Sequence, residues 1–218
     1  MRVAAITGLA VEARIARGAG LVAVATGGDA ARTEAAAERL LAEGASALLS
    51  FGIAGGLDPG LAPGSLLLPR LVRSEDGATF PVDAAWRARV LTALRASGLV
   101  PEEGDLLGAA RIVAASSAKA ELHRRTGAIA VDLESHVAAQ AAAQAGRPFL
   151  ALRAVADPAW CVLPAAAVLP LDDEGRPRLG RVLLCVLRDP RQIPALLRVA
   201  RDTARALTAL RRAAAALR

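Results

Sequence analysis

The sequence predicts an α/β protein in which helices pack outside a mostly central sheet. Short apolar segments typical of buried strands alternate along the chain with longer segments of helical character. The 218 residues suit one domain with a single substantial core. Because no internal repeat, disordered linker or break in composition divides the chain, we expect one domain over residues 1–218.

The expected strands are short and apolar. They cover residues 2–7, 20–25, 47–51, 65–68, 107–114, 128–131 and 148–156. Segment 47–51 (Ala-Leu-Leu-Ser-Phe) is followed closely by Gly52, Gly55 and Gly56. Glycine adopts positive φ and lets a ligand or another backbone approach closely. We therefore expect the strand to end at residue 51 and a ligand-binding turn to follow it, as is common at the carboxyl ends of strands in open α/β sheets.

The expected helices are rich in alanine, and several have residues that suit their ends. They cover residues 29–41, 83–96, 117–125, 134–145 and 190–217. Asp29 suits an N-cap, while Gly98 and Gly127 suit the C-terminal ends of the second and third helices. Residues 164–180 have mostly loop character, so the chain is expected to reach its last helix through a long connection.

Several functional classes are disfavoured by composition. The longest apolar candidate segment, 160–171, contains 12 residues and two prolines, which is too short to cross a bilayer. The N-terminus has no signal-peptide pattern. Cys161 and Cys185 have neither disulfide nor zinc spacing, and with His123 and His136 they form no ligand cluster. We therefore expect no metal and a reducing, cytoplasmic setting.

Positive charge is concentrated at the C-terminus. The chain has a net charge of +6, and the segment from Arg181 onward carries nine arginines against Asp189 and Asp202. A solvated helix face, attraction to an anionic membrane surface and nucleic-acid binding are the three interpretations. Aromatic residues make up only 2% of the chain, so few side chains are available to stack on bases. We therefore expect no nucleic-acid partner and leave the other two interpretations open.

Three motifs, together with Glu12 after the first strand, resemble the nucleoside phosphorylase and nucleosidase superfamily. Residues 52–56 (Gly-Ile-Ala-Gly-Gly) resemble its Gly-x-Ala-Gly-Gly loop. Residues 131–135 (Val-Asp-Leu-Glu-Ser) resemble its ribose-binding Val-Glu-Met-Glu-Ala motif, and residues 153–157 (Arg-Ala-Val-Ala-Asp) its base-protonating Arg-x-x-Ser-Asp motif. The resemblance runs in order from residue 1 to about residue 157. The superfamily includes purine nucleoside phosphorylases and methylthioadenosine/S-adenosylhomocysteine nucleosidases.

The stretches 50–59, 131–136 and 155–159 further resemble the hopanoid-associated phosphorylase branch, whose proposed substrate is adenosylhopane. The resemblance implies a three-layer α/β/α domain with a twisted, partly barrel-like mixed sheet. It also implies adenine release by N-glycosidic cleavage and a homo-oligomer, with a dimer favoured. The alternatives are a nucleosidase for a small 5′-substituted adenosine such as methylthioadenosine, and a non-catalytic nucleoside- or lipid-binding protein.

Breaking a purine N-glycosidic bond requires a protonated base, a stabilised oxocarbenium ion and a placed nucleophile. By resemblance, Asp157 protonates adenine N7, for which its site must keep it protonated or share a proton. Glu134 accepts hydrogen bonds from the ribose diol, and its charge favours the oxocarbenium ion. Glu12 activates the attacking water, and Arg153 helps to hold it.

Other residues are expected to contact the substrate. The same motifs supply Leu133, Ile53, Ala54 and Gly55. Segment 111–117 lacks the aromatic residue that stacks on adenine in methylthioadenosine nucleosidases, so Trp160 is the candidate to replace it. Ala156 stands where the family has serine, which removes one polar support for the base.

The nucleophile is water or phosphate, and the sequence favours water. A carboxylate at Glu12 repels a phosphate dianion, and Ile53 supplies no hydroxyl group to phosphate. Phosphorolysis stays open because other groups lie near the relevant loops, namely Arg14, Arg17, Arg32 and the Gly27-Gly28 pair. No cofactor is implied, although phosphate is a possible co-substrate.

Segment 160–171 is mostly apolar and is interrupted by Pro164 and Pro170. It is expected to pack in the core, to form a wall beside the 5′ side of the ribose, or both. A pentacyclic triterpenoid would require a wide apolar surface there. The expected partner is a small-molecule nucleoside with a hydrophobic 5′ group, and the expected location is cytoplasmic or membrane-peripheral.

Overall fold

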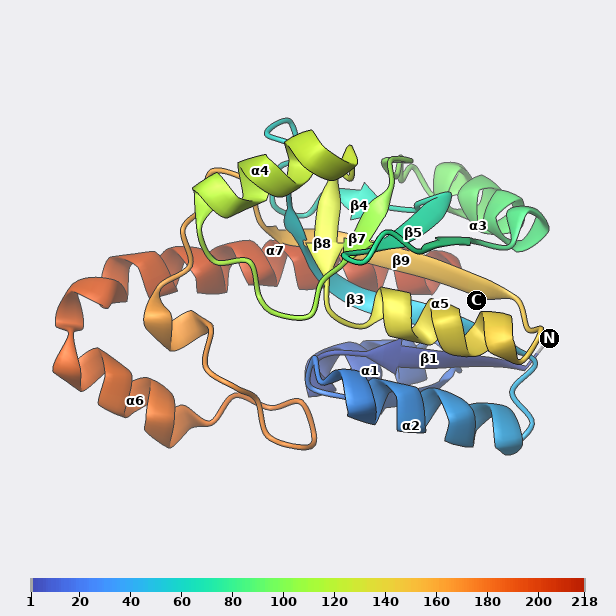
Figure 1. Ribbon diagram of the computed structural model, residues 1–218, viewed down its shortest axis with the longest axis horizontal. Helices are drawn as coiled ribbons and strands as arrows, with labels where there is room; N and C mark the ends of the chain where they lie inside the picture. The colour runs from blue at the N-terminus through green and yellow to red at the C-terminus, as the bar shows by residue number, and fades with distance from the viewer. Residues whose placement is uncertain (1, 218) are drawn as a thin grey trace.

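A nine-stranded mixed sheet forms the centre of the protein in the computed structural model, which describes residues 2–217 (Figure 1). The strands are β1 Val3–Thr7, β2 Val22–Ala25, β3 Ala47–Gly56, β4 Leu66–Leu67, β5 Leu71–Ser74, β6 Thr79–Pro81, β7 Leu106–Gly108, β8 Ala130–Asp132 and β9 Phe149–Asp157. Their order is β2-β1-β3-β8-β7-β5-β6, and β9 pairs with both β3 and β4. The sheet is mixed, as the family resemblance implies.

The longest strands, β3 and β9, lie side by side and parallel along the middle of the sheet. Their register runs from Leu48 opposite Phe149 to Ala54 opposite Val155, and it then shifts so that Gly55 lies opposite Asp157. The last residues of β3 also pair with β8, which runs antiparallel to β3. The carboxyl end of β9 and the end of β8 therefore both meet the glycine-rich half of β3.

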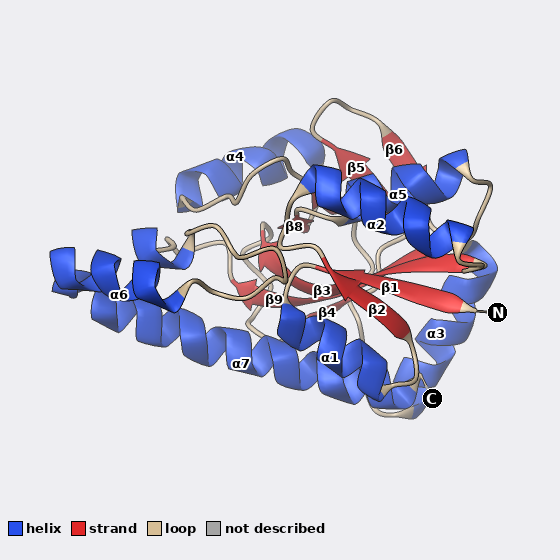
Figure 2. Ribbon diagram, turned by 90° about the horizontal axis from the view of Figure 1, so that it is seen from below, coloured by secondary structure: helices blue, strands red, loops and turns tan. Residues whose placement is uncertain are grey.

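Helices cover both faces of the sheet and complete the three layers. They are α1 Ala10–Gly18, α2 Ala30–Ala42, α3 Ala84–Ala96, α4 Ser116–Thr126, α5 Ser135–Gln144, α6 Leu179–Arg188 and α7 Ile193–Ala216, with 3-10 turns η1 Ala165–Ala167 and η2 Pro190–Gln192. Figure 2 shows α1 and α7 on one side of the central strands and α2 and α5 on the other. The observed architecture confirms the predicted α/β fold class.

Small side chains bring the helices close to the sheet. Ala138 and Ala142 of α5 are fully buried, as are Ala206 and Ala213 of α7. A helix that presents alanine to a sheet can pack closely against it at little cost in side-chain entropy. The high alanine content therefore reflects the two helix layers as well as helix propensity.

Helix ends follow local side-chain chemistry. The Asp29 carboxylate accepts a hydrogen bond from the Arg32 backbone N–H at 2.8 Å, and Asp83 accepts one from Trp86 at 2.7 Å. Each bond satisfies one of the backbone donors left free in a first helical turn. Gly127 ends α4 with a φ of 69°, a left-handed conformation that glycine adopts without strain. The predicted N-cap at Asp29 and helix end at Gly127 are confirmed.

The predicted turn after residue 51 is wrong, because β3 continues through all three glycines to Gly56. The backbone there has partners on β8 and β9, so it remains in the sheet. The predicted strand 107–114 is too long, since β7 ends at Gly108. The backbone N–H of Ala110 donates instead to the Glu75 carboxylate at 2.8 Å, where the chain has left the sheet.

Four elements were not expected from the sequence: α1, β5, β6 and α6. Helix α6 has no buried residue, and Figures 1 and 2 show it lying beside the N-terminal part of α7, beyond the edge of the sheet. Within residues 2–217, no helix is long and apolar enough to span a membrane.

Candidate active site

A cavity of about 440 Å³ opens where β1, β8 and β9 end beside the glycine-rich half of β3. Its polar lining includes Glu12, Asp132, Glu134, Arg153 and Asp157. Leu133, Ile53, Ala54 and Gly55 line it as well. Residues from three separate sequence motifs are therefore assembled around one space.

Arg153 is fully buried on β9 and gathers the acidic side chains of the cavity. Its Nη2 lies 2.6 Å from Asp132 Oδ2 and 3.1 Å from Glu134 Oε2, and it donates to Ser50 Oγ at 2.6 Å. Burying a guanidinium is costly unless it is paired, and here it has two carboxylates and the hydroxyl groups of Ser50 and Ser135 as partners. The ion pairs hold the arginine and the two carboxylates in fixed relative positions.

The glycines of β3 make room for this cluster. A Cβ at Gly52, the neighbour of Arg153 across the sheet, would lie 2.6 Å from Arg153 Nη1 and 2.8 Å from Glu12 Oε1. Such distances are far inside van der Waals contact, so a larger residue would displace the charged groups. The glycine motif thus lets side chains from β9 and α1 lie directly against the strand.

Glu12 is buried, with 1% of its surface exposed, and its carboxylate is held by two backbone amides. The Leu9 N–H donates to Oε2 at 2.7 Å, and the Ile53 N–H donates to Oε1 at 2.8 Å. Burial raises the pKa of Glu12 to about 7, although the positive charge of Arg153 opposes this effect. A carboxyl group with such a pKa is suited to act as a general base near neutral pH.

Glu134 stands at the first position before α5, where it meets both Arg153 and the loop after β1. A Cβ at Gly8 would lie 2.5 Å from Glu134 Oε1, so this carboxylate also packs against glycine backbone. Burial raises the pKa of Glu134, with Arg153 again opposing. The pKa values of Glu12 and Glu134 are raised for the same main reason, because burial leaves each carboxyl group with little water to solvate its charge.

Asp157 ends β9 and pairs with Lys119 of α4, whose Nζ lies 2.5 Å from Asp157 Oδ2. Burial raises the pKa of Asp157, and the Lys119 ammonium lowers it. None of the motifs recognised in the sequence includes Lys119. The available signal was compositional, because it is the only lysine in a chain that otherwise uses arginine.

Asp132 is the second residue of the site without a predicted role. It is buried, it pairs with Arg153, and the Ser135 hydroxyl and backbone N–H both donate to it. Its place within motif 131–135 was the signal that could have found it. Asp132 therefore belongs to the support of Arg153.

Trp160 is not brought together with the other predicted residues. Its surface is 57% exposed, and it lies outside the cavity lining. Ile112 and Val113, from the segment without an aromatic residue, do line the cavity. The cavity therefore has an apolar surface from this segment without Trp160.

The cavity is also lined by a large apolar surface. Part of it comes from the predicted wall segment, with Leu163, Ala166, Ala167, Leu169, Pro170 and Leu171. The rest comes from the two C-terminal helices, with Val182, Leu196, Val199 and Ala200. The loop before α6 is fastened near the acidic cluster, because the Ala10 N–H donates to the Gly175 carbonyl at 3.1 Å. One cavity thus combines an acidic cluster with an apolar wall.

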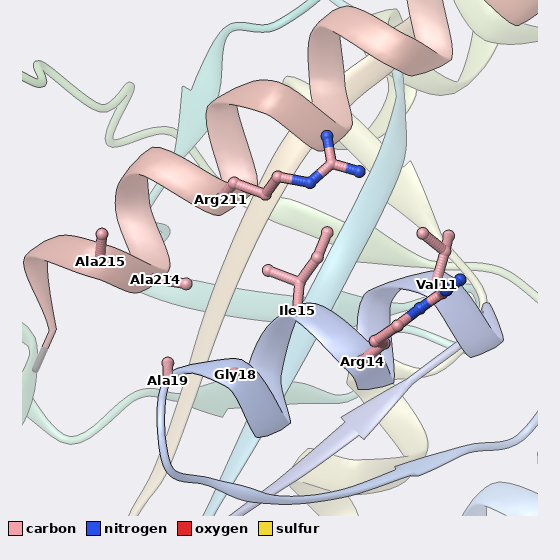
Figure 3. A pocket seen from close by; sticks show the side chains of 8 residues that line it. All are labelled: Val11, Arg14, Ile15, Gly18, Ala19, Arg211, Ala214 and Ala215. Atoms are coloured by element: carbon pink, nitrogen blue, oxygen red, sulfur yellow. The ribbon is translucent and has the colours of Figure 1, made fainter.

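The three arginines considered for phosphate do not line this cavity. Arg17 donates twice to the Ala23 carbonyl, and Arg32 pairs with Asp173 at 2.5 Å. Arg14 borders a different hollow between α1 and α7, lined on the other side by Arg211 (Figure 3). Among residues 2–217, no group of three or more His, Cys, Asp or Glu side chains is arranged to hold a metal ion.

Several solved structures have the same fold. The methylthioadenosine/S-adenosylhomocysteine nucleosidase of Neisseria meningitidis, in complex with methylthio-immucillin-A, is 20% identical, with a TM-score of 0.71 and 98% of each chain covered. The Helicobacter pylori nucleosidase with butyl-thio-DADMe-Immucillin-A is 14% identical, with a TM-score of 0.67 and 96% of each chain covered. Futalosine hydrolase of Helicobacter pylori is 16% identical, with a TM-score of 0.64, over 71% of this chain and 87% of the hydrolase. No curated protein matches the sequence.

The fold and the match to a family model together define the class of protein: an enzyme that cleaves N-glycosyl bonds, either a nucleosidase or a nucleoside phosphorylase. The family model for the Phosphorylase superfamily matches residues 8–187. The chain belongs to that superfamily.

Proposed function

We propose that this enzyme hydrolyses the N-glycosidic bond of an adenosine that carries a large apolar 5′ substituent, and so releases adenine. Adenosylhopane is the substrate that the sequence resemblance implies. The observation that carries the proposal is the cavity itself, in which Glu12, Glu134 and Asp157 share one space with an apolar wall. A nucleoside with an apolar tail would match this cavity, because its polar nucleoside part would meet the acidic residues and its tail would meet the apolar wall.

The proposed chemistry gives each acidic residue one task. Asp157 donates a proton to adenine N7 as the C1′–N9 bond breaks, and the bonding electrons leave with the base. Glu134 accepts hydrogen bonds from the ribose hydroxyls and stabilises the positive charge on the sugar. Glu12 takes a proton from the water that attacks C1′, which yields a ribose product with a new hydroxyl group. Arg153 holds Glu134 in position. The Leu9 and Ile53 backbone amides hold Glu12.

Hydrolysis is favoured over phosphorolysis by the charges that surround the cavity. Glu12, Asp132 and Glu134 are gathered around Arg153, and each of these carboxyl groups repels a phosphate dianion when it is ionised. The arginines that were candidates for phosphate binding have other partners or border other surfaces. Water needs no such cation.

The apolar substituent is supported by the lining of the cavity. A volume of about 440 Å³ lies within the usual range for small-molecule sites. Leucine, valine, proline and alanine side chains from the segment before α6, from α6 and from α7 form the wall. A methylthio group would cover little of this surface, whereas a polycyclic hydrocarbon would cover much of it.

The deciding experiment measures adenine release from adenosylhopane and from methylthioadenosine, each with and without phosphate. We expect phosphate-independent release and a preference for adenosylhopane in kcat/KM. Formation of the sugar 1-phosphate only when phosphate is present would replace hydrolysis by phosphorolysis. A preference for methylthioadenosine would support the small-substrate alternative. Tight binding of both compounds without any cleavage would support the non-catalytic alternative.

We further propose that the enzyme contacts an anionic membrane surface through α6, and that it acts as a homo-oligomer, with a dimer favoured. Leu179, Leu183 and Leu187 of α6 are more than half exposed, and α6 also contributes Val182 to the cavity lining. Exposed leucines flanked by arginines are typical of helices that lie in a membrane interface. An apolar substrate held in a bilayer would then meet the enzyme beside its binding cavity.

A further inference from the structure

Lys119, the only lysine of the chain, is fully buried on α4. Its Nζ contacts Asp157 Oδ2 at 2.5 Å, the Pro158 carbonyl at 3.0 Å and the Cys161 carbonyl at 3.2 Å. An ammonium group has three N–H donors, and each of the three has an acceptor here. The side chain is therefore built into the site as a charged, fully hydrogen-bonded group.

The choice of lysine at this position has a physical reason. A buried cation is costly and is tolerated where it is paired and hydrogen-bonded. The ammonium is compact, whereas a guanidinium is wide and planar, so only lysine fits a small space bounded by one carboxylate and two carbonyls. A chain that uses arginine at its other cationic positions has kept lysine at this buried point.

The contact joins Lys119 to one oxygen of the carboxyl group proposed to protonate the base. Asp157 lines the cavity with 16% of its side chain exposed, and the ammonium contacts Oδ2. In the proposed chemistry, the other oxygen, Oδ1, is the one that carries the proton for the base. When Oδ1 gives up its proton, negative charge appears on a carboxylate that already has a cation beside it.

We propose that Lys119 is a positioning residue that stabilises the carboxylate of Asp157 as its proton moves to the leaving base. The Asp157 O–H bond breaks, the N7–H bond forms, and the C1′–N9 electrons pass to the purine. Lys119 keeps all three of its protons throughout. This inference rests on the proposed function, because it assigns a task to Lys119 only if Asp157 is the proton donor.

Burial and Lys119 act on Asp157 in opposite directions. Burial favours the protonated form that can donate, and Lys119 favours the carboxylate that results. The other charged groups are less direct: Arg198 and Asp202 of α7 act on the nearby Cys161 thiol, and Arg111 lines the cavity. Lys119 is the charged side chain in contact with the Asp157 carboxyl group.

A magnetic-resonance titration tests the contact without any substrate. Protein labelled with [13Cε]lysine gives one side-chain resonance, because the chain has one lysine. We expect this resonance to move as Asp157 titrates and to lose that movement in Asp157→Asn. A pH response that is the same in wild type and Asp157→Asn would overturn the proposal. Wild type and Asp157→Asn suffice for this measurement, so it does not depend on the folding of a Lys119 variant.

Kinetics of Lys119→Met, Asp157→Asn and the double variant test the catalytic consequence. Lys119→Met is expected to lower kcat by about 10²-fold and to move the Asp157 ionisation in the pH profile of kcat/KM to higher pH. When Asp157 is already replaced by Asn, Lys119→Met is expected to lower kcat by less than about 3-fold. An unshifted profile with multiplicative losses would show a merely structural role. If wild type cleaves no nucleoside, the proposed function fails, and the titration still decides the Lys119–Asp157 coupling.

Discussion

The acidic side chains of the cavity share a single buried guanidinium, and their ionisation is therefore linked to folding. Arg153 contacts Asp132 and Glu134 directly, and its charge also acts on Glu12. Glu134, Arg153 and Asp157 were predicted from the sequence because they lie in motifs with fixed spacing. Lys119 was assigned no role because its contacts are with residues distant in the sequence. Asp132 lies inside motif 131–135, but its pairing with Arg153 is visible only in the structure.

The raised pKa of Glu12 predicts that the stability of the protein depends on pH. Its pKa is about 7 in the folded protein against 4.5 in the unfolded chain. Between these values the unfolded chain binds fewer protons, so the free energy of unfolding falls as the pH rises, by about 3 kcal/mol for this group. Glu134 acts in the same direction. Denaturant unfolding of the ligand-free protein at pH 4.5 and pH 8 measures the change, and Glu12→Gln should lose the Glu12 share of it. An equal pH dependence in Glu12→Gln would contradict the assignment.

Asp157 is predicted to act in chemistry more than in binding. Asp157→Asn retains a hydrogen-bonding group but has no proton to give to N7, so kcat is expected to fall by about 10²–10⁴-fold with little change in ligand affinity. Adenine release and calorimetric binding of a nucleoside analogue are the measurements. Asp76→Asn, at an exposed position in the turn between β5 and β6, is the matched control and should leave both unchanged. Activity within a few-fold of wild type in Asp157→Asn would remove Asp157 from the mechanism.

At the scale of elements, the sequence predicted helices from their caps more reliably than strands from their glycines. Asp29 and Gly127 act locally, so their effects are visible in the sequence. The glycines of β3 act through the side chains that lie against them, which no local pattern reveals. Helix α1 was missed because Leu9 precedes it where a polar N-cap is usual; the Glu12 carboxylate, three residues later, accepts from the Leu9 N–H instead.

Gly52 tests this account of β3. In Gly52→Ala the new methyl group would meet Arg153 and Glu12 at less than 3 Å, so both side chains must move. Overpacking of this kind typically costs about 1–3 kcal/mol of stability, and activity should fall further because the cluster is displaced. Gly180→Ala in α6, where a Cβ meets nothing within 4 Å, is the matched control. Thermal unfolding and adenine release are measured on both variants. If Gly52→Ala has the same stability and activity as Gly180→Ala, then the close contact of Gly52 with Arg153 and Glu12 is not required for folding or activity.

For the whole molecule, alternating strands and helices predicted the fold class, while the mixed strand order came from the family resemblance. Strand order depends on pairings such as β3 with β8 and β9, which join residues about 75 to 100 positions apart. Helix α6 was not predicted from the sequence, and in the structure none of its residues is buried in the core. In the folded chain, α6 and α7 lie beside the segment after β9, and together they form the apolar wall of the cavity.

The last prediction concerns the surface around α6. Leu183 and Leu187 are exposed, and Arg181, Arg188 and Arg191 lie beside them in the sequence, so α6 is expected to bind anionic but not neutral vesicles. High salt should reverse the binding, since the Debye length falls from about 10 Å at 0.1 M to about 3 Å at 1 M. Arg201 and Arg205 pair with Asp202, which reduces their contribution.

Vesicle co-sedimentation separates the two parts of this surface. Neutralising Arg181, Arg188 and Arg191 to glutamine should weaken binding and flatten its salt dependence, because the long-range attraction is removed. Leu183→Glu with Leu187→Glu should abolish binding while methylthioadenosine cleavage in solution, if present, is retained. Neutralising Arg211 and Arg212, which are exposed near the opposite end of α7, removes two charges away from α6; this control should change binding little. Binding to neither vesicle type would exclude membrane contact through α6, and equal binding to both would exclude the electrostatic attraction. In either case the chemistry proposed for Glu12 and Asp157 would still stand.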